Sequence, residues 1–125
     1  MRIKGISWVG VKTDEFVALG TFCKSVLGLP VLLDRPDFLV FRMPDGDQLE
    51  LFGPSARHPP AQFASNRVVC GFLVDDLDSA RRELEQAGIE LLGGPERDSK
   101  TGYAWQHFRG PDGLVYELAY DPNRP

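Results

Sequence analysis

A repeated segment of 11 residues constrains the fold of this chain more than any other feature. Residues 41–51 read FRMPDGDQLEL and residues 108–118 read FRGPDGLVYEL, so Phe, Arg, Pro, Asp, Gly, Glu and Leu recur at an offset of 67 residues. A weaker echo relates residues 8–14 to residues 69–75 at an offset of 61. Repeats at a fixed offset indicate that one structural unit is used more than once. The chain therefore consists of two similar halves.

Each half predicts the same order of secondary structure. A strand rich in Val, Ile, Phe and Trp is expected over residues 3–12 and again over residues 67–74. Apolar residues at helical spacing follow, and then Gly28 or Gly88, which suits the left-handed end of a helix. A short strand and a hairpin around Pro-Asp-Gly complete each half, because Pro fixes φ and Gly permits a positive φ. We therefore expect an α+β fold of two tandem βαβββ modules.

The helical stripes, the linker and one irregular stretch complete the predicted organisation. The 125 residues fit one domain, with module 1 at about 1–53, a proline-rich linker at about 54–66 and module 2 at about 67–125. We expect residues 93–102 to form a solvated surface loop, or alternatively a lid over a site. The apolar stripes that the two helices should bury are Phe16, Leu19, Cys23, Val26 and Leu27, then Leu77, Ala80, Leu84 and Ala87.

Composition excludes several classes of function. The net charge is −4 and the 14 basic residues are scattered, whereas a nucleic-acid surface needs clustered Lys and Arg. No apolar run approaches the roughly 20 residues of a membrane-spanning helix, and no signal-type segment opens the chain. The two cysteines form no CxxC pair. We expect a cytoplasmic protein that binds neither nucleic acid nor membranes.

The paired βαβββ pattern, with a Pro-Asp-Gly hairpin leading to a Glu in each half, resembles the vicinal oxygen chelate superfamily. Glyoxalases, bleomycin-resistance proteins and ring-cleaving dioxygenases belong to that superfamily. The resemblance covers nearly the whole chain and is carried best by residues 41–51, 74–78 and 108–118. It implies a half-open barrel with helices on the outside, a ligand cavity between the modules and a homodimer. Fold alone says little about the reaction.

The resemblance also locates the positions where metal-binding members hold their ion. The last-strand carboxylates correspond to Glu50 and Glu117, but Trp8 and Val69 stand where such members usually have His. Neither Trp nor Val coordinates a divalent metal, and two carboxylates fall short of the usual three or four protein ligands. We therefore expect no cofactor. A divalent metal remains an alternative through a non-standard site of His107, Glu117 and Glu50.

Strand alternation and hairpin register select the residues expected to face the ligand. Folding the second hairpin about Asp112 places His107 opposite Glu117, and the first hairpin places Val40 opposite Glu50. A carboxylate beside an imidazole orients the ring and can share its proton. We identify Glu117 and His107 as candidate catalytic residues. The expected ligand-binding residues are Trp8, Phe38, Gln48, Glu50, Phe52, Tyr103 and Trp105.

Two hypotheses follow from these residues. The first is a small-molecule-binding protein of the glyoxalase/bleomycin-resistance type, without the usual metal centre, that binds an aromatic or cationic ligand. The second is an enzyme, a lyase, isomerase, epimerase or dioxygenase-like protein, that uses Glu117 and His107 as base and acid, with or without a metal. The sequence leaves open whether the protein is an enzyme.

Overall fold

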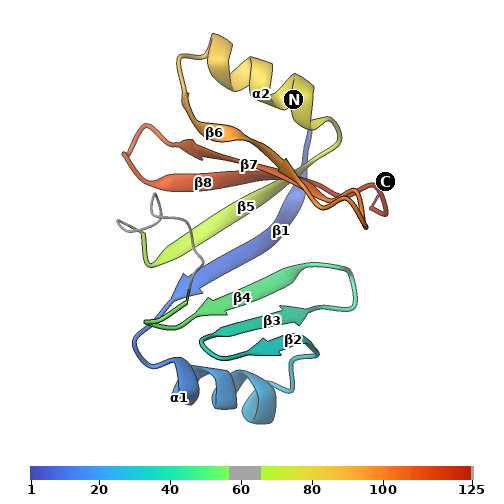
Figure 1. Cartoon of the computed structure of the whole chain (residues 1–125). Coiled ribbons are helices and arrows are strands. Elements are labelled where there is room, and N and C mark those ends of the chain that lie inside the picture. Colours follow the sequence, from blue (N-terminus) through green and yellow to red (C-terminus); the bar gives the residue numbers. More distant parts are fainter. Residues whose placement is uncertain (57–65, 125) are drawn as a thin grey trace. The chain divides into compact units, whose positions relative to one another are not determined.

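The computed structural model describes residues 1–56 and 66–124. Contacts within the chain define two compact units, Trp8–Val69 and a unit that combines Met1–Ser7 with Cys70–Pro125. Strand β1 (Ile3–Lys12) and strand β5 (Val68–Val74) each contribute residues to both units. Figure 1 shows the elements of both units.

The first module has the order β1, α1, η1, β2, β3, β4. Its strands are arranged β2-β3-β4-β1. Strand β4 runs parallel to β1 and antiparallel to β3, while β2 and β3 form an antiparallel hairpin. Helix α1 lies along these strands (Figure 1). The bounds of the remaining elements are Phe16–Thr21 for α1, Phe22–Val26 for η1, Val31–Arg35 for β2, Phe38–Arg42 for β3 and Gln48–Phe52 for β4.

The helix of this module does not bury its whole predicted stripe. Cys23 packs in the core with strand residues, and Phe16 and Leu19 pack against that core, but Val26 is 70% exposed and Leu27 is 53% exposed. The cause is a π-helical turn, in which the amide of Leu27 bonds the carbonyl of Phe22 five residues earlier. Such a turn shifts the phase of the residues that follow. The prediction that Val26 and Leu27 are buried is therefore wrong, and Ala87 of the second stripe is exposed as well.

The second module has the order β5, α2, β6, β7, β8, with its strands arranged β5-β8-β7-β6. Strand β8 is parallel to β5 and antiparallel to β7, which also pairs antiparallel with β6. Asp76 caps α2, since its Oδ1 accepts the amide of Ser79 at 2.9 Å. The bounds are Leu77–Gln86 for α2, Glu90–Arg97 for β6, Ala104–Arg109 for β7 and Val115–Tyr120 for β8.

Strand β6 extends further than the sequence indicates. Residues 93–97, expected within an irregular stretch, belong to β6 and continue its pairing, with Arg97 opposite Ala104. A bulge between Leu92 and Glu96 interrupts the ladder, and Gly93 adopts a φ of 74°. Gly and Pro at a bulge read as loop residues in sequence, although the strand continues beyond them. The prediction of a loop is therefore wrong for residues 93–97.

Each module keeps its core on the face of the sheet that its helix covers. In the second module Val74, Leu118 and Ala104 pack with Leu77 and Ala80 of α2. The alternation of the strands then leaves the odd-numbered side chains of β7 and β8 on the face away from α2. The predicted α+β fold of two βαβββ modules is confirmed. Among the described residues, no helix is long and apolar enough to cross a membrane.

Candidate functional site

Strands β7 and β8 bring His107 and Glu117 directly opposite each other, as the hairpin register predicts. The Nε2 atom of His107 lies 2.9 Å from the Oε2 atom of Glu117, within hydrogen-bond distance. The two residues are only 5% and 4% exposed. A titratable pair on the face of the sheet away from α2 is therefore held almost completely out of water.

Burial affects the protonation of Glu117. It raises the pKa of the Glu117 carboxyl, because removal from water penalises the charged form. The hydrogen bond and charge of His107 oppose that shift, and the negative charge of Glu96 adds to it. Cys70 has a raised thiol pKa from burial and from the charge of Glu117. Burial thus favours the protonated form of both the Glu117 carboxyl and the Cys70 thiol.

Two aromatic residues, Trp105 and Tyr103, lie at the end of β7 where the strand begins. Trp105 precedes His107 by two residues on β7, so both side chains lie on the same face. The ring centroids of Trp105 and Tyr103 are 6.0 Å apart, and both residues are partly exposed. Trp105 lies opposite the buried Ala119 of β8, a small residue that leaves room for the indole. The second module thus combines a polar pair with an accessible aromatic surface.

The first module carries a second aromatic group, made of Trp8, Phe38 and Phe52. The Phe38 and Phe52 ring centroids are 5.2 Å apart. A Cβ atom added to Gly10 would lie 2.4 Å from Cη2 of Trp8 and 3.3 Å from Cε2 of Phe52. The Trp8 indole therefore fills the space next to Gly10, beside Phe52. Trp8 is only 6% exposed, so its ring is packed and not free in solvent.

Two polar residues predicted to bind ligand flank this aromatic group. Gln48 pairs with Trp8 on β1, and Glu50 pairs with Gly10 on β1 and with Val40 on β3. Both are partly buried. The expected opposition of Val40 and Glu50 is confirmed. Glu50 thus occupies the strand position next to the glycine that the Trp8 ring covers.

The residues present do not fit the usual metal centre of the superfamily. Trp8 and Val69, at the positions of the histidine ligands, are apolar side chains buried to 6% and 2% exposure. In the described ranges 1–56 and 66–124, no three His, Cys, Asp or Glu residues gather into a group that could hold an ion. His58 lies outside the described residues.

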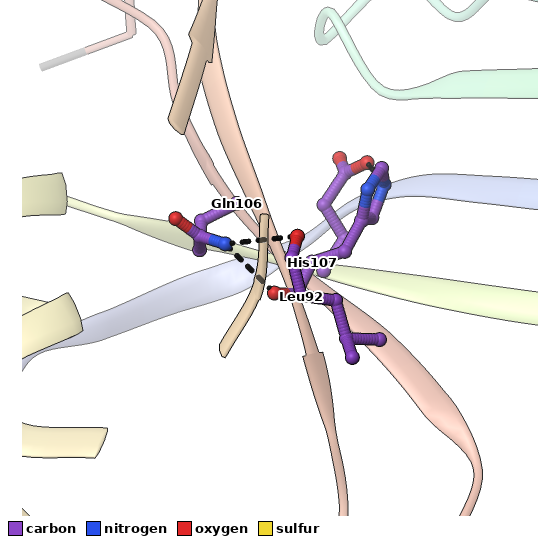
Figure 2. A network of polar contacts seen from close by, with 4 residues as sticks. Leu92, Gln106 and His107 are labelled. Carbon is purple, nitrogen blue, oxygen red and sulfur yellow. Dashed lines mark hydrogen bonds and ion pairs between the residues drawn. The ribbon is translucent and has the colours of Figure 1, made fainter. Parts of the chain in front are cut away.

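Sequence reasoning missed Gln106, which is fully buried on the helix side of β7. Figure 2 shows that the side chains of Gln106 and His107 leave the strand on opposite sides. The Oε1 atom of Gln106 accepts a hydrogen bond from Nε of Arg81 on α2, at 2.8 Å. A polar residue at a core-facing position of a strand could have signalled this network, because a buried amide requires partners.

The fold and these residues place the chain in a known class of two-module α+β proteins. A profile described as Glyoxalase/Bleomycin resistance protein/Dioxygenase superfamily matches residues 5–118. The chain therefore belongs to this superfamily. No curated protein sequence matches the chain.

Several solved structures share the fold. Methylmalonyl-CoA epimerase from Mycobacterium tuberculosis is 18% identical with a TM-score of 0.70, and the match covers 95% of this chain and 89% of that one. A variant of the Streptomyces coelicolor methylmalonyl-CoA epimerase, in complex with 2-nitronate-propionyl-CoA, is 19% identical with a TM-score of 0.68, covering 97% and 99%. A Vibrio splendidus 12B01 member of the superfamily is 19% identical with a TM-score of 0.65, covering 90% and 96%. At these identities the likeness shows the fold alone.

Proposed function

We propose that this protein binds a small organic molecule, aromatic or cationic, without the usual metal of its superfamily. The observation that carries the proposal is the buried His107–Glu117 pair beside the partly exposed Trp105 and Tyr103. A carboxylate close to aromatic faces favours a cation, which gains from both the charge and the ring quadrupole. Trp8, Phe38, Phe52, Gln48 and Glu50 are the ligand-binding residues proposed in the first module.

Ligand binding is tested by thermal unfolding of purified protein in the presence of a chelator. Metal-free bleomycin serves as a cationic aromatic probe and propionyl-CoA as an anionic one. We expect bleomycin to raise Tm, because a ligand that binds only the folded state stabilises it. Glu117→Gln should abolish this rise, and Glu85→Gln, which removes an exposed carboxylate on α2, should preserve it. Stabilisation by propionyl-CoA alone would contradict the cationic assignment.

The metal-independent part of the proposal has its own test. Elemental analysis of the purified protein should find less than one tightly bound divalent ion per chain. One stoichiometric ion that survives dialysis against a chelator, and whose loss lowers Tm, would refute it. We further propose that the protein is a cytoplasmic homodimer. Light scattering after size-exclusion chromatography tests the dimer, because it measures the mass of the protein in solution.

The second candidate function is acid–base catalysis of the epimerase or isomerase type. It is favoured by the hydrogen bond between Glu117 and His107 together with the raised pKa of Glu117, because a higher pKa makes the carboxylate a stronger base. Glu117 would remove a proton from a carbon next to a carbonyl group, and His107 would return a proton to that carbon.

Deuterium exchange separates this candidate from simple binding. Methylmalonyl-CoA, the ligand of a structurally similar epimerase, is incubated with the protein in D₂O and its α-proton is followed by NMR. Catalysis predicts exchange that Glu117→Gln and His107→Ala abolish and Glu85→Gln preserves. Absence of exchange with the wild-type protein would rule out this substrate.

A further inference from the structure

Gln106 is buried completely, and every polar atom of its side chain is engaged. Oε1 accepts from Nε of Arg81 at 2.8 Å. Nε2 donates to the carbonyl oxygens of Gly93 at 3.0 Å, of His107 at 2.9 Å and, more weakly, of Leu92 at 3.4 Å. Figure 2 shows the bonds to Leu92 and His107. An unpaired buried amide costs several kcal/mol, so this side chain is fixed by its partners.

Two of the carbonyl partners of Gln106, those of Leu92 and Gly93, lie at the bulge of β6. Leu92 lies opposite His107, and the next register pair is Glu96 with Trp105, so residues 93–95 face the single residue Gln106. A bulge leaves backbone groups without partners in the ladder. The side-chain amide of Gln106 on β7 donates to the carbonyl oxygen of Gly93 on the neighbouring strand β6. The bulge and this side chain therefore depend on each other.

The same amide also fixes the backbone of the next residue. His107 follows Gln106 directly, and its carbonyl accepts from Gln106 Nε2 on the helix side while its imidazole meets Glu117 on the other side. Because the imidazole is attached to this backbone, a rotation of the peptide would displace the imidazole relative to Glu117. Bulges near functional sites commonly orient a side chain in this way.

We propose that Gln106 is a positioning residue, which locks the β6 bulge and the β7 backbone so that the His107 imidazole is held against Glu117. The inference rests on the proposed function, in which this pair contacts the ligand. Arg81 supports the network from α2 but touches only Oε1 of Gln106. The acceptor Oε1 and the donor Nε2 of the Gln106 side chain can therefore be tested separately.

Three substitutions make this separation. Gln106→Met keeps the length of the side chain and loses all of its hydrogen bonds. Gln106→Glu keeps the acceptor for Arg81 but loses the donor to Gly93 and His107. Arg81→Met is the matched control, because it removes the bond to α2 and leaves the donor in place.

The readout is the hydrogen bond of the imidazole itself. The chain has two histidines, so a His58→Gln background leaves His107 as the single imidazole for ¹⁵N NMR. We expect exchange of the His107 ring N–H with solvent to accelerate at least about tenfold in Gln106→Met and Gln106→Glu, the scale of losing one hydrogen bond. Its ring ¹⁵N shifts should move as well. Arg81→Met should stay close to the parent protein in both measurements.

Three results would overturn the proposal. One is an unchanged His107 spectrum in a folded Gln106 variant. Another is an equal change in Arg81→Met, which would make the effect one of general stability. If neither Gln106 variant folds, Gln106 serves the fold and not the pair, and the proposal is also wrong. The NMR measurement needs no ligand. Failure of the bleomycin or deuterium-exchange experiments would therefore contradict the proposed function without affecting the test of Gln106.

Discussion

The contact between Trp8 and Gly10 supports a sharp prediction for Gly10→Ala. The new Cβ would lie 2.4 Å from Cη2 and 2.6 Å from Cζ2 of Trp8, distances that real Cβ contacts do not reach. Phe52 closes the neighbouring space, with Cε2 at 3.3 Å from the same point. The indole is rigid and packed, so it has to leave its position across β1.

The magnitude follows from the cost of overpacking a filled core. Such substitutions destabilise by about 1–3 kcal/mol, which for a domain of this size lowers Tm by roughly 3–10 °C. The chain has two tryptophans, so a Trp105→Phe background makes Trp8 the only indole emitter. Urea unfolding should show the loss of stability, and the native emission of Trp8 should shift to longer wavelength as the ring gains water.

Gly94→Ala is the control for this experiment. Among the described residues nothing lies within 4 Å of a Cβ built at Gly94, and its φ is not in the left-handed region. It should therefore change stability by less than about 0.5 kcal/mol, as is usual for surface substitutions. A Gly10→Ala protein with parental stability and emission would refute the reasoning, and so would an equal loss in Gly94→Ala.

Three further predictions concern single residues. Burial raises the pKa of Glu117, so its contribution to the stability of the folded protein is complete below the unfolded pKa of about 4.3 and is lost as the pH rises through the raised folded pKa. Glu117→Gln should remove this pH-dependent fall in stability from urea unfolding measured across pH. A fall that persists in Glu117→Gln would mean that another group causes it. Asp76→Ala should cost about 1 kcal/mol through loss of its cap to Ser79, and unchanged thermal unfolding would contradict that role. Phe41→Ala should cost about 3–5 kcal/mol, because Phe41 is fully buried; a loss under about 1 kcal/mol in urea would show that the core refills the space.

The repeat made much of the fold and part of the site predictable. Hairpin pairing depends on the position of a turn, and Pro-Asp-Gly marks that position in both halves. The opposition of His107 to Glu117 and of Val40 to Glu50 could therefore be worked out from residue numbers. Local turn chemistry fixes local register because side chains alternate with a period of two.

The sequence could not predict the features that depend on a local departure from regular geometry. The apolar stripe is predicted on the spacing of a regular α-helix. The π-helical turn before Leu27 departs from that spacing, and Val26 and Leu27 are exposed. The bulge of β6 carried the strand through a Gly-Gly-Pro stretch that reads as a loop. In both places one or two extra residues are accommodated by hydrogen bonds that no periodic pattern encodes.

By itself, the sequence determined the two βαβββ modules and the register of both hairpins. Only the tertiary structure decided how the residues of the candidate site are used. It placed the Trp8 ring across Gly10 and buried the His107–Glu117 pair. It also gave the buried Gln106 side chain its hydrogen bonds to the backbone carbonyls of Gly93 and His107. The physical reason is that periodicity assigns a side chain to a face, whereas burial and partners come from elements distant in the sequence.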